Sequence, residues 1–332
     1  MARRAAGASE AHVAQAARDA LSRGNAVDAV VTGVLVAAAE APGVLLGPLQ
    51  VLVGGAGAGL LAIDGRVRQP GLGAPRPRGV LPGERVPAQA RVGVPALPAT
   101  LATILASLGS VTLLRAAGPG LELVRARSAE RAALLHAFAR RGATALTDGG
   151  IAVELQSVAG RAAGGALTVD DLVAVRPVVM PCEERSLEPA GLLRIPWSTR
   201  GLDGASTHVV AAADARGLVA LACYETPLEG LPVPGLGLLA PAFAAPVMRG
   251  QTRIRPGEPR PAAAPIALRT RLGMVDLALG LAVATDVDAS LDALLVAIES
   301  AATLTVALDA VPSGRPVVVV RTREAALVVA SA

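Results

Sequence analysis

The chain has 332 residues and a mass of 33.1 kDa, enough to bury a sizeable core in one large domain or two smaller ones, which excludes global disorder. Hydrophobic residues make up 52% and aromatic residues only 1%, so the core must be built from alanine, valine and leucine. All 31 basic residues are arginine and the net charge is only +4. Because these arginines are neither clustered nor interleaved with aromatic residues, the sequence argues against a nucleic-acid partner.

Cysteine usage and hydropathy indicate the compartment. Cys182 and Cys223 cannot make a disulfide framework, which is typical of a reducing compartment. The first ten residues lack the apolar stretch of a signal peptide, and no run reaches the roughly 18 apolar residues of a spanning helix. We therefore expect a cytoplasmic protein with no membrane partner. No pair of histidines or cysteines has ligand spacing, so we expect no metal and no cofactor.

Two helices are predicted at the start of the chain. The first covers residues 9–21, with Ser9 as N-cap, and the second runs from Asn25 to about Ala41. Asn25 and Asp28 have the spacing of a capping box. The second helix is apolar nearly all round, which is typical of a buried helix.

A glycine-rich stretch, GGAGAG at residues 54–59, separates two predicted strands at 49–53 and 60–63. A dinucleotide-binding loop needs a helix after it. Here a second strand and an Asp64-Gly65 hairpin turn follow, so we interpret the glycines as a tight β connection. Residues 68–95 are rich in proline, glycine and arginine and are predicted to form an ordered loop.

Helices dominate the predicted first half of the chain, and strands appear in the second, which gives an α+β fold class. Thr168 and Asp171 have capping-box spacing at another helix start. Residues 176–205 are predicted to be irregular. The remaining predicted elements are helices at 98–108, 128–141 and 290–303, strands at 207–213 and 218–224 joined by a turn at 214–217, short strands after 265, and a last strand at 316–321.

Five segments, taken together and in this order, resemble the γ-glutamyltranspeptidase family of N-terminal-nucleophile hydrolases. They are the helices ending in GNAVDA at 24–29, the segment 94–109, GGALTVDDL at 164–172, STH at 206–208 and VPGLGLL at 233–239. The resemblance implies a four-layer αββα sandwich that cleaves itself between Ala205 and Ser206. Residues 1–205 would then be a large-subunit-like region and 206–332 a small-subunit-like region of one domain. Only about ten residues separate Trp197 from Ser206, so the large-subunit side is truncated relative to the family.

The chemistry implied by this resemblance needs no catalytic triad. A hydroxyl at a new N-terminus has its own α-amine beside it, and an amine with a pKa of about 7.7 can accept the hydroxyl proton. Ser206 is the candidate nucleophile, and His208 would lie on the same face of the strand. The family uses threonine, and a shift of one residue would give that role to Thr207. The sequence leaves both assignments open.

Several positions depart from the family's binding site. The family holds a substrate carboxylate with an arginine just before an Ala-Pro pair; residues 70–73 contain none, and only Arg76 could substitute. The family's asparagine corresponds to Pro227, and its amine-binding run corresponds to the apolar residues 240–246. Tyr224 is expected to pack in the core with its hydroxyl at the rim. Glu225 and Glu229 are expected to be solvated loop carboxylates.

Three hypotheses follow for the function. In the first hypothesis, the chain is a non-catalytic relative of the family that serves as a binding or assembly subunit, either by itself or together with a catalytic partner subunit. Alternatively, it is an amidohydrolase that uses Ser206 on a small amide or γ-glutamyl substrate, or an unrelated α/β protein with accidental matches. A chain so rich in apolar residues also suggests self-association into a homo-oligomer. Convergence of polar groups near Ser206 would separate the first two hypotheses. The candidates are Thr207, His208, Tyr224, Glu225, Glu229 and Arg76, and of these Arg76, Tyr224 and Glu225 are the candidate substrate-binding residues.

Overall fold

The computed structural model contains helices and antiparallel sheets, in agreement with the expected α+β class. It describes residues 4–55, 57–147, 149–187, 190–197, 205–227, 230–282, 287–300, 317–321 and 327–330. Within these ranges, no helix has the length and apolar character needed to cross a membrane.

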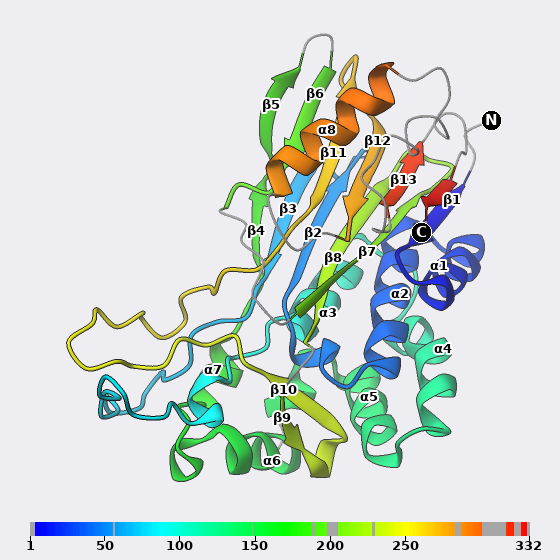
Figure 1. Cartoon of the computed structure of the whole chain (residues 1–332). Coiled ribbons are helices and arrows are strands. Elements are labelled where there is room, and N and C mark those ends of the chain that lie inside the picture. The colour runs from blue at the N-terminus through cyan, green and yellow to red at the C-terminus, as the bar shows by residue number, and fades with distance from the viewer. Residues whose placement is uncertain are drawn as a thin grey trace.

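Strands from both halves of the sequence form a first six-stranded antiparallel sheet in the order β1-β7-β8-β2-β3-β4 (Figure 1). Its strands are β1 (Ala5–Ala8), β2 (Leu49–Gly54), β3 (Leu60–Gly65), β4 (Val178–Pro181), β7 (Ala205–Ala213) and β8 (Val219–Pro227). The predicted turn at 214–217 joins β7 to β8, with Gly217 at φ 87°. β2 and β3 pair across the glycine-rich connection as expected.

A second six-stranded antiparallel sheet has the order β14-β13-β12-β11-β6-β5. Its strands are β5 (Glu183–Leu187), β6 (Ala190–Arg194), β11 (Ile266–Arg271), β12 (Met274–Leu281), β13 (Val317–Arg321) and β14 (Leu327–Ala330). A separate pair consists of β9 (Gly230–Val233) and β10 (Leu238–Pro241). An apolar cluster that includes Leu52, Leu221 and Leu268 fills the space between the two large sheets.

Helices cover the other face of the first sheet (Figure 1). The helices that contact its strands are α1 (Ala11–Arg23), α2 (Ala26–Glu40) and α3 (Leu97–Leu108). α4 (Leu113–Arg125) and α5 (Ala129–Arg141) pack on α2, whereas α6 (Gly149–Ala159) packs against β9 and α7 (Val169–Ala174) packs against α6. α8 (Val287–Ser300) contacts β12 of the second sheet instead. Five short 3-10 helices complete the described elements: η1 (Val44–Leu46), η2 (Ala88–Arg91), η3 (Gly142–Thr147), η4 (Arg161–Ala163) and η5 (Pro234–Leu236).

Two long connections, 66–96 and 242–265, lie side by side (Figure 1). The Val80 N–H donates to the Val247 carbonyl over 2.8 Å, and the Arg249 N–H donates to the Val80 carbonyl over 2.9 Å. The predicted ordered loop at 68–95 is therefore confirmed, and its partner is a segment about 170 residues later in the chain.

The predicted capping box of α2 is present. The Asn25 side chain accepts from the Asp28 N–H, and the Asp28 carboxylate accepts from the Asn25 N–H over 2.7 Å. Asp28 is only 1% exposed and also accepts from the N–H groups of Ser110 and Val111 and from the Ser110 hydroxyl. The Asp28 carboxylate therefore links the start of the buried helix α2 to the segment at residues 110 and 111, which leads into α4.

Three local predictions were wrong. Ser9 is not an N-cap, because α1 starts at Ala11 and the Ser9 hydroxyl accepts from the Val209 N–H instead. Asp64 and Gly65 do not form a turn; they end β3 and pair with Gln50 and Leu49. The region 176–205 is not irregular, since it contains β4, β5 and β6. Two helices were not predicted: α4, which continues through Gly118-Pro119-Gly120, and α6.

Replacement of Asp28 with alanine tests the role of this carboxylate in stability. Asp28→Ala leaves partly buried donors of Asn25 and Ser110 without their acceptor, so the free energy of unfolding should fall by about 1 to 3 kcal/mol in urea titrations. Asp19→Ala is the control, because Asp19 is an exposed α1 residue that accepts from Gln15 only. An equal loss in both variants would contradict this role.

Candidate functional site

The predicted nucleophile region lies at the start of β7, beside the end of β8. Ser206 pairs with Thr226, Thr207 with Glu225, and His208 with Tyr224. Four of the residues singled out from the sequence, Thr207, His208, Tyr224 and Glu225, therefore lie in adjacent cross-strand pairs.

Strand alternation nevertheless divides these residues between two faces of the sheet. Val209 and Cys223 belong to the core between the two sheets, whereas Val210 and Tyr224 belong to the core under the helices. Thr207 and Glu225 consequently face the second sheet. Ser206 and His208 share the helix-facing side, as the sequence predicted for that pair.

On the helix-facing side, His208 stacks on Tyr224 with ring centroids 5.4 Å apart and planes 16° from parallel. Tyr224 packs in the core as expected, but its hydroxyl does not end at a rim, because Tyr224 is fully buried and donates to Glu10 Oε2 over 2.6 Å. The same oxygen lies 3.5 Å from His208 Nδ1. Burial lowers the pKa of His208, against the opposing charge of Glu10, with a smaller lowering from the positive charge of His12.

On the other side, Glu225 is buried in β8 and is not a solvated loop residue. It is 1% exposed, and its Oε1 accepts from the Ala263 N–H over 2.6 Å. Its Oε2 has no hydrogen-bond partner among the described residues. Burial raises the pKa of Glu225 to about 7, although the Ala263 hydrogen bond acts in the opposite direction. Glu229, the other predicted loop carboxylate, lies outside the described residues.

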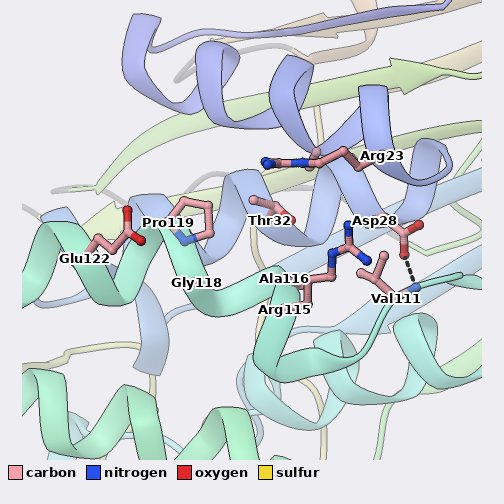
Figure 2. A pocket seen from close by; sticks show the side chains of 10 residues that line it. Arg23, Asp28, Thr32, Val111, Arg115, Ala116, Gly118, Pro119 and Glu122 are labelled. Atoms are coloured by element: carbon pink, nitrogen blue, oxygen red, sulfur yellow. Dashed lines mark hydrogen bonds between the residues drawn. The ribbon is translucent and has the colours of Figure 1, made fainter.

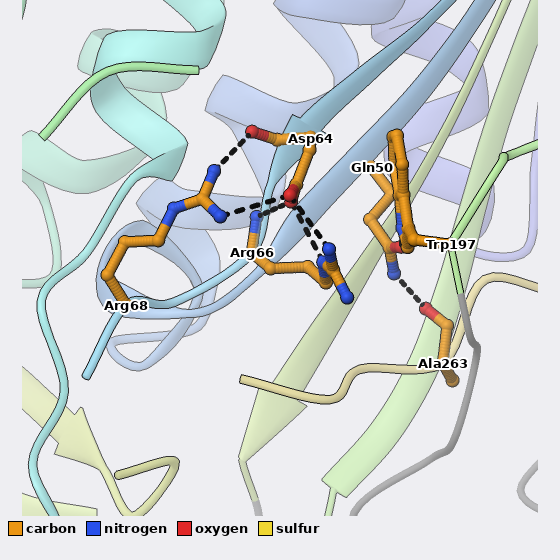
Figure 3. Close-up of polar contacts among 6 residues, drawn as sticks. All are labelled: Gln50, Asp64, Arg66, Arg68, Trp197 and Ala263. Atoms are coloured by element: carbon orange, nitrogen blue, oxygen red, sulfur yellow. Dashed lines mark hydrogen bonds and ion pairs between the residues drawn. The ribbon is translucent and has the colours of Figure 1, made fainter. Parts of the chain in front are cut away.

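A chain of side-chain contacts continues from Ala263 toward β3 (Figure 3). Gln50 Nε2 donates to the Ala263 carbonyl over 2.5 Å, and Trp197 Nε1 donates to Gln50 Oε1 over 2.6 Å. The Arg66 guanidinium lies over the Trp197 ring, 5.1 Å from its centroid. These contacts connect Glu225, through backbone and side chains, to the arginines at the end of β3.

Asp64 holds two arginines beside this chain (Figure 3). Arg66 donates to both of its carboxylate oxygens over 2.9 Å, and Arg68 Nη1 donates to Oδ2 over 3.0 Å. Burial raises the pKa of Asp64, but the Arg66 hydrogen bond and the charges of Arg68 and Arg66 outweigh burial and hold that pKa below its usual value. The two guanidiniums are therefore already paired.

A cavity of about 470 Å³ opens beside this cluster. Its lining includes Asp64, Arg66, Arg68, Arg176, Met180 and Trp197. Arg76 does not line it and is exposed in the 66–96 connection, where it makes no hydrogen bond or ion pair with described residues. Arg66 and Arg68 lie before the stretch that precedes Ala74-Pro75 and were not predicted as site residues. The signal that could have found them is the Asp-Gly-Arg-Val-Arg order directly after a predicted strand.

Comparison with known proteins shows the fold. No protein-family model and no curated protein matches this chain. Cephalosporin acylase from Bacillus halodurans matches with a TM-score of 0.68 and 15% identity over 85% of this chain and 78% of the acylase. A structure of LmbA matches with a TM-score of 0.68 and 14% identity over 93% of this chain and 84% of LmbA.

A third structure relates to the family suggested by the sequence. γ-Glutamyltranspeptidase from Pseudomonas nitroreducens matches at 19% identity over 56% of this chain and 69% of that chain, with a TM-score of 0.48. The chain is therefore similar in fold to N-terminal-nucleophile hydrolases. At these identities the likeness shows the fold alone.

The buried carboxyl of Glu225 predicts a specific pH dependence of stability. Its folded-state pKa of about 7 lies above the ordinary value of 4.5, so the folded protein binds this proton more tightly than the unfolded chain. As pH rises from about 4.5 to about 7, this group lowers the free energy of unfolding by up to about 1.4 kcal/mol per pH unit.

Glu225→Gln should abolish the fall in the free energy of unfolding that the Glu225 carboxyl causes as pH rises. Urea titrations at pH 5 and pH 8 should show a smaller difference in the free energy of unfolding for this variant than for the wild type. Glu183→Gln, at an exposed position in β5, should keep the wild-type difference. The assignment fails when all three proteins lose the same stability between these pH values.

Proposed function

We propose that this chain is a γ-glutamyltranspeptidase-like protein with a four-layer αββα arrangement that has lost γ-glutamyl transfer and acts as a non-catalytic binding or assembly subunit. One observation carries the proposal: in the described part of the chain, the polar side chains on the face of Ser206, which are His208, Tyr224 and Glu10, contact one another and not the Ser206 hydroxyl. That hydroxyl makes no hydrogen bond with described residues, and alternation places it on the sheet face opposite Thr207 and Glu225. An N-terminal nucleophile needs polar groups around the attacked carbonyl to stabilise the developing charge.

The residues that correspond to the family's binding site, and the arginines at the end of β3, also disfavour a γ-glutamyl head group. An α-ammonium needs a carboxylate, but residues 240–246 are alanine, proline and phenylalanine, with Phe243 buried. Gln69 fixes this segment by donating to the Ala245 carbonyl and accepting from the Ala245 N–H. A charged group left unpaired there would cost several kcal/mol. For the substrate carboxylate, Arg66 and Arg68 are already occupied by Asp64.

A second candidate function has one specific observation in its favour. Thr207 is 8% exposed and pairs across the strands with Glu225, on the face between the sheets. A carboxyl with a pKa of about 7 is suited to accept or return a proton at neutral pH. The alternative is therefore a self-cleaving amidohydrolase that uses Thr207 or Ser206. The similarity in fold to cephalosporin acylase would fit an amide substrate less polar than a γ-glutamyl group.

Intact mass under denaturing conditions separates the two candidates. We expect a single 33.1 kDa species after prolonged incubation of the purified protein at neutral pH. Two fragments that meet at Ala205 and Ser206, or at Ser206 and Thr207, would overturn the non-catalytic proposal. Ser206→Ala and Thr207→Ala are the matched variants, because loss of cleavage in only one of them would identify the nucleophile.

The proposed assembly function is supported by an exposed edge of the first sheet. β4 ends the strand order, and Val178, Val179 and Met180 are 44%, 49% and 41% exposed. An apolar edge strand offers unpaired backbone groups to another strand. A second copy of the chain is the proposed occupant of this edge.

Sedimentation velocity tests the edge directly. The wild type should sediment as an oligomer, and Val179→Lys should shift it to the monomer, because a charge on an edge strand opposes pairing. Leu272→Lys is the control, since Leu272 is 89% exposed in the β11–β12 hairpin, away from that edge. A monomeric wild type would remove the self-association hypothesis.

A further inference from the structure

A second cavity lies in the helical layer, among α1, α2 and α4, outside the site described above (Figure 2). Its volume is about 220 Å³. The lining consists of Ala20, Arg23, Asp28, Thr32, Val111, Arg115, Ala116, Gly118, Pro119 and Glu122. Small side chains keep the space open, and three helices each contribute polar groups to it.

Two arginines line this cavity without an anionic partner. Arg23 is in the last turn of α1, and Arg115 is in the first turn of α4. Neither forms an ion pair with a described residue. Figure 2 shows their side chains extending on either side of Thr32. Both arginines are exposed to solvent, and the same lining also carries the carboxylates of Asp28 and Glu122.

Local structure does not explain Arg115. The N-terminus of a helix carries partial positive charge and disfavours a cation. The first turn of α4 contains no acidic residue, and the Thr112 side chain already caps the Arg115 N–H. Arg115 and the start of α4 therefore add positive potential at the same place.

The two nearby carboxylates leave both arginines unpaired. Asp28 is saturated by the donors of Asn25, Ser110 and Val111, so its acceptor sites serve the backbone rather than a guanidinium. Glu122 is exposed on the cavity wall beside Pro119 and makes no ion pair with Arg23 or Arg115.

Thr32 provides the second, independent observation. It is 2% exposed in the middle of α2, and its hydroxyl makes no hydrogen bond with described residues. A threonine within a helix commonly donates to the carbonyl four residues earlier. Thr32 does not, and it lines the cavity between the two arginines.

We propose that this cavity binds a phosphate group, with Arg23 and Arg115 as its cationic partners and the Thr32 hydroxyl as a further donor. Guanidinium groups pair with phosphate oxygens through charge-assisted hydrogen bonds, and a dianion matches two of them better than a carboxylate does. The volume exceeds that of one phosphate group, so the organic part of a small phosphomonoester also fits. This site is independent of the proposed assembly function.

Calorimetric titration of the full chain with inorganic phosphate, at constant ionic strength, tests the proposal. Arg23→Gln and Arg115→Gln should each weaken binding about tenfold, and the double variant should abolish it. Thr32→Val keeps the side-chain shape without the hydroxyl and should weaken binding about fivefold. Arg18→Gln and Arg125→Gln are matched controls, since they change exposed arginines of α1 and α4 outside the cavity and should leave affinity unchanged.

Each outcome decides the question. Unaltered binding in the double variant, or equal weakening in the controls, would overturn the site, as would acetate binding as tightly as phosphate. A parallel titration with glycerol phosphate distinguishes the sources: tighter binding than inorganic phosphate assigns a phosphomonoester, and weaker binding assigns the free ion. No binding of either probe to the wild type also overturns the proposal.

Discussion

The pairing of β7 with β8 is the constraint on which the rest of the structure depends. Each strand has nine residues, and the pair is joined by a turn that the sequence itself encodes. β1 pairs with β7, and β2 pairs with β8, so segments more than 150 residues apart in the sequence belong to one sheet. The same register fixes which side chains face the helices and which face the second sheet. The division between Ser206 and Glu225 is thus a property of the ladder, because a shift of one residue would exchange every side chain between the two faces.

Small side chains determine how closely the layers approach. A Cβ atom on Gly280 of β12 would lie 2.3 Å from a Val209 methyl of β7, and one on Gly120 of α4 would lie 2.8 Å from the Leu35 carbonyl of α2. Alanine and glycine therefore allow the backbones of neighbouring layers to come into close contact. The core is filled in this way and not by large aromatic side chains, in agreement with the composition. With so little aromatic volume between the sheets, polar side chains such as Gln50 and Glu225 become part of the packing and must find partners there.

Local signals predicted much of the fold, and contacts distant in sequence determined the rest. The α2 capping box and the 214–217 turn depend on residues within four positions, so the sequence was sufficient for both. α4 was missed because Gly118-Pro119-Gly120 is a strong helix-breaking signal, which packing against α2 overrides. The irregular interpretation of 176–205 failed because β4 and β6 are defined by partners in β3 and β11.

The candidate site was less predictable for the same reason. The sequence placed Thr207 and His208 at the start of one strand and Tyr224 at the end of another, with Glu225 in the loop after it, and the register brings all four together. It gave no indication that Glu225 is buried, since that depends on the Ala263 N–H 38 residues later. Nor did it indicate that Arg66 and Arg68 share Asp64, which requires β3 to extend through the residues interpreted as a turn.

Glu225 differs in kind from the other buried ionisable groups near it. Asp64 is compensated by two guanidiniums, and the Tyr224 hydroxyl is compensated by Glu10, so each stabilises the arrangement around it. Glu225 has one partner for one oxygen and none for the other among the described residues. A glutamine would accept from the Ala263 N–H equally well and would not become charged at neutral pH. The property that glutamate adds at this position is therefore a proton exchanged near pH 7, beside Thr207. That property is a stability penalty in a purely structural chain and an asset in a catalytic one, and the mass of the incubated protein decides which description applies.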